Sequence, residues 1–178
     1  MHVRAARPDD AEALRTAVSR AREATVFDDI GAPLLDVSAA GVREAAAEAE
    51  WSFLMEDEEG PVGVAIAHPD VEVTTDESTD AEESADDARD ANGGDREAEL
   101  LALWVHPNHA GEGVASELLA RIASSVADRG VGTLRATVPA DSPGATEFFS
   151  AHGFVHRGTC RGPAGDESIV VTDVDALR

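Results

Sequence analysis

Apolar positions along this chain recur with two different periods, which predict a mixed sheet with helices on its faces. Alternating or continuous apolar runs predict strands at residues 2–5, 51–56, 61–68, 98–105, 133–138, 154–158 and 168–172. Apolar residues spaced three and four apart predict helices over residues 8–24, 39–49, 114–129 and 143–152. Because strands and helices interleave in this order, we expect a single α/β domain over residues 1–178.

Capping signals support the last two helices. Ser142 offers an N-cap side chain, and Pro143 suits the first helical position. Gly153 predicts a left-handed cap at the end of this helix, with Phe154 folding back as its hydrophobic contact. The apolar stripe of the preceding helix consists of Val114, Leu118, Leu119, Ile122, Ala123 and Val126.

A glycine-bearing loop, residues 110–115, joins the strand at 98–105 to the helix that follows. A helix N-terminus reached through such a loop presents backbone N–H groups that lack helical partners. These groups and the helix dipole favour an anion, so the segment predicts a phosphate-binding site. A Walker loop is excluded because the chain contains no lysine. A dinucleotide fingerprint fits poorly, because Ser116 stands where its last glycine or alanine is expected.

The charge balance is strongly acidic, with 36 Asp and Glu residues, 14 basic residues and a net charge of −22. All the basic residues are arginine, and tyrosine is absent. Such a composition is similar to that of halophilic proteins from salt-saturated cytoplasm, where salt screens self-repulsion. An acidic mesophilic protein is the alternative. In either case the absence of a basic cluster argues against nucleic-acid binding.

Residues 70–97 form the most acidic stretch, with twelve acidic residues and two arginines. This stretch contains too little apolar surface to offset the entropy cost of ordering it. We therefore expect a mobile insertion between two core strands. Its carboxylates lack the spacing of a calcium-binding loop, so no metal site is expected there.

Cysteine usage and the start of the chain bound the cellular setting. Cys160 is the single cysteine, which excludes an intrachain disulfide and a multi-cysteine metal site. The first residues lack the apolar segment of a signal peptide, and no apolar run has the length of a membrane span. We expect a cytoplasmic protein with no membrane partner.

Two motifs in this chain resemble those of the GNAT superfamily of N-acetyltransferases. The first, Arg/Gln-x-x-Gly-x-Gly/Ala after a strand that ends in Val-x-Pro, falls on Ala110, Gly113 and Ala115. The second, Asn-x-x-Ala-x-x-Phe-Tyr closed by Gly-Phe, falls on residues 142–149 and 153–154. Their order and spacing extend the resemblance over nearly the whole chain apart from the acidic insertion.

The resemblance implies a GNAT fold, with a central mixed, mostly antiparallel sheet of about six to seven strands, one splayed strand pair and about four flanking helices. It also implies transfer of an acetyl group from acetyl-CoA to a primary amine of a small molecule or peptide. The amine would attack the thioester directly in a ternary complex. No metal is implied, and the protein is expected to be a monomer or a homodimer.

The resemblance assigns acetyl-CoA binding to residues in both motifs and in the strand before them. Backbone N–H groups of the loop would hold the pyrophosphate, and the end of the strand would pair with the pantetheine arm. A backbone N–H near that strand end would also polarise the thioester carbonyl. The assigned residues are Leu103, Trp104, Val105, Ala110, Gly111, Glu112, Gly113, Val114, Ala115, Ser142 and Phe149.

Three side chains of this site depart from the family pattern. Ala110 replaces the usual arginine or glutamine, and Ser142 replaces the usual asparagine. Glu112 adds a negative charge, so we expect it to point to solvent. Anion binding would then depend on backbone donors and on screening by salt.

A fourth departure concerns catalysis. Phe149 replaces the tyrosine that is thought to protonate the leaving thiolate in many family members. Because general acid help is worth about 10²–10⁴-fold, either transfer is slower without it or the domain binds acyl-CoA without catalysis. Glu99 is the candidate general base, with Glu97 at the same strand parity, unless both simply continue the acidic insertion. Further candidate bases are His68, His106, His109 and His152.

The acceptor amine is not identified by the sequence. Residues 25–38 are expected to line its side of the cleft, where Asp28, Asp29 and Asp36 favour a cationic amine. A non-catalytic acyl-CoA-binding or regulatory module is the alternative function, prompted by Phe149 and Ala110. A nucleotide-binding protein is a third hypothesis, which the glycine spacing disfavours.

Overall fold

The computed structural model describes residues 1–10, 12–13, 16, 51–69, 96–162 and 165–178. The described strands are β1 (His2–Ala5), β2 (Ser52–Glu56), β3 (Pro61–Pro69), β4 (Arg96–Val105), β5 (Val131–Pro139), β6 (Val155–Gly162) and β7 (Gly165–Asp173). The described helices are α3 (Val114–Ala127), α4 (Pro143–Ala151) and the short 3-10 helices η1 (Pro107–His109) and η2 (Val174–Leu177). None of these helices is long and apolar enough to cross a membrane.

The predicted strands all form, and two of the four predicted helices form where the periodicity placed them. The predicted helices at residues 8–24 and 39–49 lie largely outside the described residues. Of the roughly four flanking helices predicted, the described residues therefore contain two, α3 and α4. Most of the insertion at residues 70–97 also lies outside the described residues, as do residues 25–38.

The strands form one sheet in the order β1-β2-β3-β4-β5-β7-β6. β4 and β5 are parallel, whereas every other pair of neighbours is antiparallel. The predicted mixed, mostly antiparallel sheet is confirmed. β6 is longer than predicted and reaches Gly162, because backbone pairing with β7 continues to Gly165 in a segment that has no apolar alternation.

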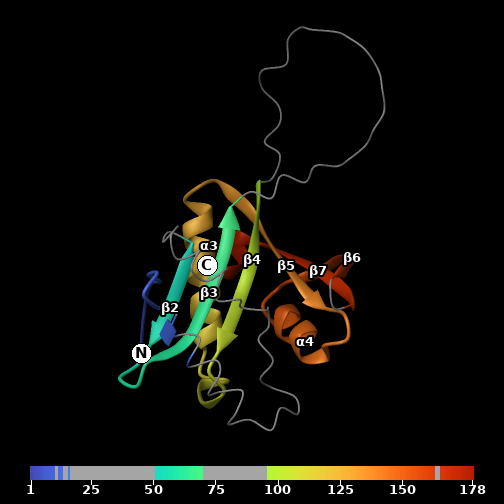
Figure 1. The fold of residues 1–178 in the computed structure, drawn as a ribbon. Helices are drawn as coiled ribbons and strands as arrows, with labels where there is room; N and C mark the ends of the chain where they lie inside the picture. Colours follow the sequence, from blue (N-terminus) through green and yellow to red (C-terminus); the bar gives the residue numbers. More distant parts are fainter. Residues whose placement is uncertain (11, 14–15, 17–50, 70–95, 163–164) are drawn as a thin grey trace, which may run out of the picture.

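β4 and β5 separate partway along their length, as Figure 1 shows. Their pairing runs from Arg96, opposite Val131, to Leu100, opposite Ala136, and stops there. On its other side β4 stays paired with β3, apart from a bulge at Leu101, which has no partner in β3. The predicted splayed pair is therefore present, and it leaves the last residues of β4 without a neighbour on the β5 side.

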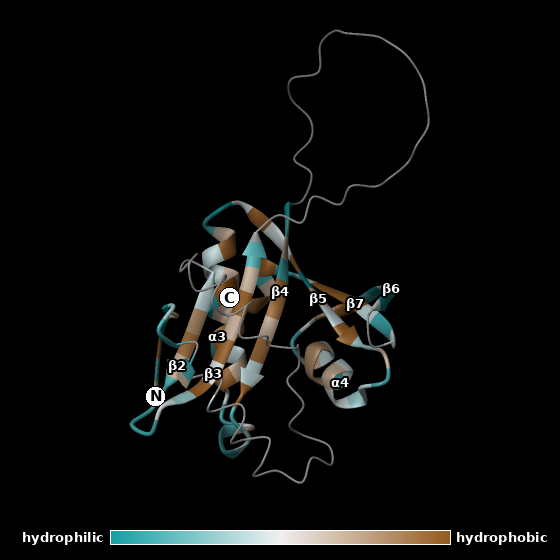
Figure 2. Ribbon diagram, viewed as in Figure 1, coloured by the Kyte–Doolittle hydropathy of each residue, from teal (hydrophilic) through white to brown (hydrophobic). Residues whose placement is uncertain are grey.

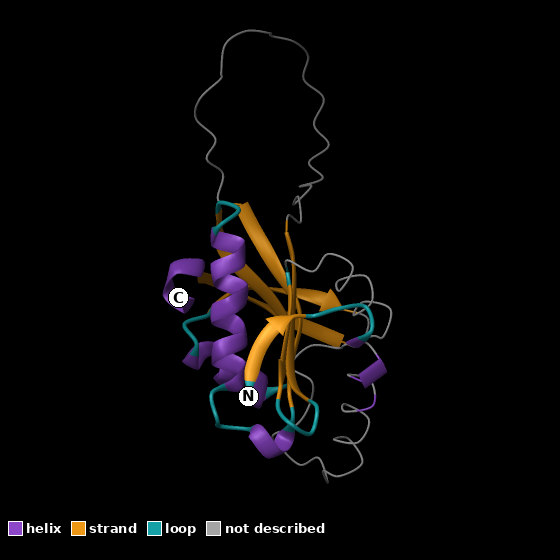
Figure 3. Cartoon of the chain, turned by 90° about the vertical axis from the view of Figure 1, so that its left-hand side faces the viewer, coloured by secondary structure: helices purple, strands orange, loops and turns teal. Residues whose placement is uncertain are grey.

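Helix α3 lies along one face of the sheet (Figure 3). All six residues of its predicted apolar stripe are buried, and they pack with strand residues such as Leu100, Leu103 and Leu134. Figure 2 shows the hydrophobic residues concentrated in the central strands, whereas β6 is predominantly hydrophilic. Burial of this stripe fixes α3 on the sheet, and with it the position of the glycine loop.

The start of α3 approaches β3 closely at Gly63. A Cβ atom at this position would lie 2.7 Å from Val114 Cγ1 and 3.0 Å from Leu118 Cδ1. Both distances are too short for carbon atoms in contact, so only glycine lets the first turn of α3 lie against the sheet here. The first turn of α3, next to the glycine loop, therefore packs tightly against β3.

The edge strand β1 is held by a cluster of charged side chains. The Arg4 guanidinium donates to both carboxylate oxygens of Asp10 at 2.7 and 2.8 Å, and to those of Glu56 on β2 at 3.1 and 2.8 Å. These hydrogen bonds from Arg4 lower the pKa of Asp10 and of Glu56 below their ordinary values, against an opposing effect of burial. Both acids are therefore charged partners of Arg4 near neutral pH.

Candidate functional site

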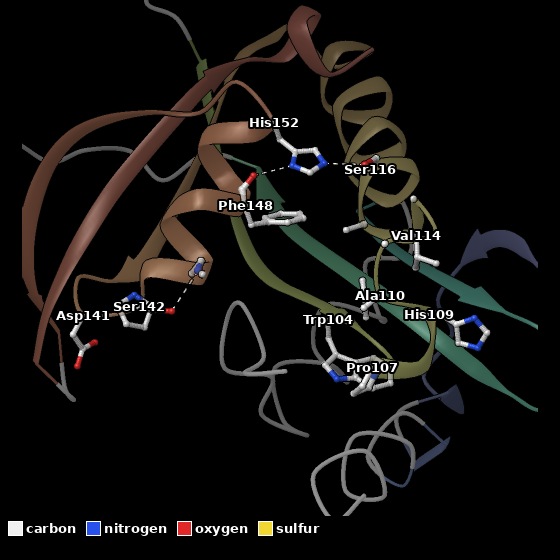
Figure 4. Close-up of a pocket in the computed structure, with 17 residues that line it drawn as sticks. Trp104, Pro107, His109, Ala110, Val114, Ser116, Asp141, Ser142, Phe148 and His152 are labelled. Carbon is white, nitrogen blue, oxygen red and sulfur yellow. Dashed lines mark hydrogen bonds between the residues drawn. The ribbon is translucent and has the colours of Figure 1, made fainter. Parts of the chain in front are cut away.

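A pocket of about 630 Å³ lies between the diverging ends of β4 and β5, the start of α3 and one side of α4 (Figure 4). It occupies the gap that the splay opens in the sheet. Eight of the predicted binding residues line it: Trp104, Val105, Ala110, Gly111, Gly113, Val114, Ala115 and Ser142. The structure thus brings together residues from both sequence motifs.

The pocket opens onto the N-terminus of α3. Gly113 is the N-cap residue, with a left-handed φ of 83°, and no side chain caps the helix. Glu117 donates its N–H to Gly113 O at 3.0 Å. The three preceding N–H groups, of Val114, Ala115 and Ser116, therefore have no acceptor within the helix. Such a terminus is suited to an anion.

The two glycines of the loop are explained by backbone conformation. Gly111 and Gly113 have φ values of 81° and 83°, in the left-handed region that other residues rarely adopt. An added Cβ at either position would meet no heavy atom within 4 Å. Glycine is needed here to turn the chain into the helix, and not because neighbouring atoms crowd it.

Glu112 does not line the pocket. Its N–H donates to His109 O at 3.3 Å, so this group is not among the free donors of the loop. Its carboxylate oxygen Oε2 lies 2.7 Å from His109 Nδ1, and the side chain is 48% exposed. The negative charge is therefore directed toward His109 and solvent. The N–H of Ala110 is also engaged, with Pro107 O at 3.1 Å, so the backbone donors of the site come from Gly111 and from residues 113–115.

His109 connects the loop to the turn between β2 and β3. Its Nε2 lies 3.4 Å from Asp57 Oδ2, and its ring packs edge-on against His106. Hydrogen bonds from the N–H groups of Glu59 and Gly60 lower the pKa of Asp57 below its ordinary value, and the nearby His109 acts in the same direction. A charged Asp57 thus holds His109 at the rim of the pocket.

The end of β4 offers both side chains and backbone to the pocket. Trp104 and Val105 line it, while the Leu103 side chain is fully buried in the core. His106 donates its N–H to Val62 O at 2.7 Å. Since alternate residues of an antiparallel ladder direct their N–H groups to the same neighbour, those of Leu103 and Val105 point away from β3. They face the gap between β4 and β5.

On the other side, Ser142 fixes the start of α4. Its Oγ accepts a hydrogen bond from the Ala145 N–H at 3.4 Å, and Pro143 follows at the first helical position. The predicted N-cap is confirmed. Because Ser142 and Ala145 also line the pocket, this capped first turn forms part of the wall.

Phe149, one of the predicted site residues, lies in the core and does not line the pocket. Its side chain is fully buried and packs edge-on against Phe148 and Phe154. Phe148, one residue earlier, lines the pocket instead. Successive helical residues point about 100° apart, so the two phenylalanines cannot share one face. Phe149 belongs to the buried core cluster, whereas Phe148 is partly buried and packs against that cluster.

His152 and Ser116 connect α4 to α3 across the pocket (Figure 4). His152 Nδ1 lies 2.9 Å from Phe148 O, and its Nε2 lies 2.8 Å from Ser116 Oγ. The imidazole ring also packs over the Phe148 ring, with centroids 4.3 Å apart. All three side chains belong to the pocket wall.

Glu99 lies beside the point where β4 and β5 separate. It is opposite Arg135 in the strand register, and Glu99 Oε2 is 3.0 Å from Arg135 Nη2. Glu97, two residues earlier, is paired with Arg157 on β6. Neither carboxylate lines the pocket. The bulge at Leu101 reverses the alternation of side chains along β4, which places Glu99 on the same face as Trp104.

Several wall residues were not among the predicted binding residues. Four of them could have been found from their helical spacing in the sequence. Gly144, Ala145, Phe148 and His152 recur at intervals that place them on one side of α4. The complete set is Pro107, His109, Ser116, Pro139, Asp141, Gly144, Ala145, Phe148 and His152.

Within the described part of the chain, no group of three or more His, Cys, Asp and Glu side chains is placed to hold a metal ion. Cys160 is exposed on β6 and does not line the pocket. Of the four candidate histidines, His109 and His152 line the pocket, whereas His68 and His106 do not.

The family model described as the acetyltransferase (GNAT) family matches residues 14–154 of this chain. No curated protein sequence matches this chain. The match includes the glycine loop, the first turn of α3 and all of α4.

Solved structures with a similar fold include the following three, all of low sequence identity to this chain. The ribosomal-protein-S18-alanine N-acetyltransferase from Escherichia coli is 18% identical, with a TM-score of 0.64 over 97% of this chain and 93% of that chain. The acetyltransferase yncA from Salmonella typhimurium, solved with its cofactor acetyl-CoA, is 17% identical, with a TM-score of 0.60 over 98% and 94%. Naa50 from Arabidopsis thaliana, solved with the bisubstrate analogue CoA-Ac-MVNAL, is 14% identical, with a TM-score of 0.65 over 96% and 97%. These likenesses concern the fold.

Proposed function

Because the chain belongs to the acetyltransferase (GNAT) family, we propose that it transfers an acetyl group from acetyl-CoA to a primary amine of a small molecule or peptide. The observation that supports this most strongly is the uncapped N-terminus of α3, which opens onto a pocket that continues into the splay between β4 and β5. A helix N-terminus suited to an anion and a pocket lined largely by apolar groups together suit the two parts of CoA.

In this proposal the pyrophosphate binds at the start of α3. The N–H groups of Gly111, Gly113 and the first helical turn would donate to its oxygens, assisted by the helix dipole. The pantetheine arm would run along β4, where Leu103 and Val105 direct their backbone groups into the gap. Trp104 and Phe148 would provide the apolar sides of this channel.

The reaction would follow from that placement. The acceptor amine attacks the thioester carbonyl, so a C–N bond forms and the C–S bond breaks. A backbone N–H of β4 would stabilise the negative charge that develops on the carbonyl oxygen. The amine loses a proton, which Glu99 accepts through water, and the CoA thiolate takes a proton from solvent.

The described part of the chain offers no evident general acid to protonate the leaving thiolate. No tyrosine exists in the sequence, and Phe149 is buried away from the pocket. Since a thiolate is a tolerable leaving group, the absence of a general acid would slow transfer without preventing it.

The acceptor is proposed only by class. The E. coli protein is named for an alanine of a ribosomal protein, and the Arabidopsis protein was solved with a CoA–peptide conjugate. A peptide N-terminus and a small cationic amine are therefore the first acceptors to test. The excess of acidic residues supports an intracellular setting with concentrated salt, and assays should include salt.

The proposal is tested by two measurements on the purified chain in about 2 M KCl. Calorimetry measures CoA binding, and a thiol reagent measures CoA release from acetyl-CoA with a panel of peptides and small amines. We expect CoA binding and amine-dependent thiol release. CoA binding without thiol release from any acceptor would favour the non-catalytic acyl-CoA module, and the absence of CoA binding would contradict both functions.

A further inference from the structure

One nitrogen of the His152 imidazole is hydrogen-bonded within its own helix, and the other lies against α3. Its Nδ1 lies 2.9 Å from Phe148 O. A carbonyl oxygen can only accept, so Nδ1 carries the hydrogen of this bond. The second nitrogen, Nε2, lies 2.8 Å from Ser116 Oγ. In a neutral ring Nε2 accepts the hydroxyl hydrogen, whereas in a protonated ring Nε2 carries a hydrogen of its own.

Ser116 places that nitrogen beside the anion-binding end of the helix. It is the third residue of α3, so its N–H is one of those without an acceptor in the helix. Helical side chains lean toward the N-terminus of their helix, which brings Ser116 Oγ toward the open N–H groups. An anion that accepts from the first turn of α3 therefore lies within reach of His152 Nε2.

The charges around His152 leave it free to respond to an anion. Its recorded partners among the described residues are Ser116 and Phe148, neither of which is charged. The charged groups nearest in sequence on α3 are Glu117 and Arg121, and α4 carries Glu147; none of the described ion pairs joins them to His152. The other imidazole of the pocket, His109, already faces Asp57 and Glu112, and Asp141 lies at the far end of the wall from His109 (Figure 4).

We propose that His152, in its protonated form, binds the pyrophosphate of CoA and thereby supplies the side-chain donor that Ala110 does not provide. This inference rests on the proposed function. Nε2–H donates to a phosphate oxygen, and Ser116 Oγ, released from the imidazole, donates to the same group. The site then contains a cation that is present only when the ring is protonated.

The proposal predicts a particular sign of pH dependence. Binding of an anion favours the protonated ring, so the affinity should be higher under acidic conditions, which protonate the ring, than under alkaline conditions. CoA itself complicates this measurement, because its phosphate monoester has a second pKa of about 6. Dephospho-CoA lacks the monoester and keeps the pyrophosphate, which makes it the appropriate probe.

The experiment is calorimetric titration of dephospho-CoA into the wild type, His152→Gln and His156→Gln between about pH 5.5 and 8.5. His156 lies on β6, is exposed and does not line the pocket, so it is a matched control. We expect the wild type and His156→Gln to bind roughly fivefold more tightly at the acid end, and His152→Gln to show no such change. Acetyl-pantetheine, which has no phosphate, should bind with the same affinity throughout this range.

A second readout is the uptake of protons on binding. Near neutral pH, binding of dephospho-CoA should take up a fraction of a proton, seen as a dependence of the binding enthalpy on the buffer. Proton uptake that persists in His152→Gln, or a pH dependence equal in all three proteins, would overturn the role of His152. Failure of dephospho-CoA and CoA to bind at any pH would instead overturn the proposed function.

Discussion

Gly113 sets the direction in which the chain enters α3. Its φ of 83° lies in the left-handed region, where an alanine costs about 1–2 kcal/mol. The Gly113→Ala variant should therefore relieve strain by moving the first turn, which carries the open N–H groups. We expect a loss of about 1 kcal/mol in unfolding free energy and a roughly tenfold weaker CoA affinity, measured by urea unfolding and calorimetry.

Gly130 provides the control for this prediction. It follows α3 at the opposite end, has a φ of 75°, and an added Cβ there would also meet no atom within 4 Å. Gly130→Ala should lose a similar amount of stability while its CoA dissociation constant stays within about twofold of the wild type. Equal losses of CoA affinity in both variants would show that the loop conformation is not what binds CoA.

The proposed role of Glu99 as proton acceptor can be tested with a single substitution. The Glu99→Gln substitution removes the proposed proton acceptor and its ion pair with Arg135 while keeping the shape of the side chain. We expect kcat/KM for the acceptor to fall by about 10²-fold, with acetyl-CoA affinity unchanged. The measurement is thiol release from acetyl-CoA at several pH values.

Glu97→Gln separates catalysis from general effects of lost charge. Glu97 lies two residues earlier on the same strand and is paired with Arg157, so its substitution also removes a paired carboxylate. Activity should stay within about threefold of the wild type in this variant. A Glu99→Gln profile that coincides with the wild type across pH would leave Glu99 with a structural role only.

At the level of elements, the sequence predicted those features that depend on regular residue spacing or on neighbouring residues. The stripe on α3 has a single buried face, so its position could be inferred from residue spacing alone. The cap at Ser142 was equally local. The bulge at Leu101 was not predictable, because it arises from the pairing of β4 with β3, which no local pattern encodes.

The candidate site divides in the same way. Residues of the loop were predictable because glycine, strand end and helix start are contiguous in sequence. The sequence could not show which of Phe148 and Phe149 turns to the core, because two adjacent phenylalanines give equal apolar signals and only packing decides between them. The contact between His152 and Ser116 spans 36 positions in the sequence and depends on how α4 lies against α3.

The Arg4 cluster on the edge strand β1 predicts that the stability of the fold depends on pH. Arg4 lowers the pKa of Asp10 and Glu56, whose ordinary values are 3.8 and 4.5. Lowered values mean that the cluster stabilises the fold above those ordinary values, and that this contribution is lost as the pH falls through the folded-state values. Arg4→Gln should reduce the unfolding free energy by about 1 kcal/mol near pH 7 and by progressively less toward pH 3.5.

Urea unfolding followed by circular dichroism at several pH values measures this difference. Arg178 offers a control, because its ion pair with Asp175 is exposed and local, so Arg178→Gln should change stability by less than about 0.5 kcal/mol at every pH. A difference between Arg4→Gln and wild type that stays constant down to pH 3.5 would mean that Arg4 acts through packing and not through its charge.

At the level of the whole molecule, the net charge of −22 creates self-repulsion that no single contact relieves. The screening length falls from about 10 Å at 0.1 M salt to about 3 Å at 1 M. We therefore expect the melting temperature to rise by roughly 10 °C between 0.1 and 2 M KCl, which corresponds to about 3 kcal/mol for a chain of this size. Differential scanning calorimetry measures this rise directly.

The charge origin of that rise can be separated from a general effect of salt on hydrophobic burial. Near pH 5, closer to the sequence pI of about 4.4, the net negative charge is smaller than at pH 7. Screening has less repulsion to relieve there, so the melting temperature should depend more weakly on KCl than at pH 7. Equal slopes at both pH values would assign the stabilisation to burial of apolar surface, which salt strengthens regardless of charge, and the acidic surface would then have no part in salt tolerance.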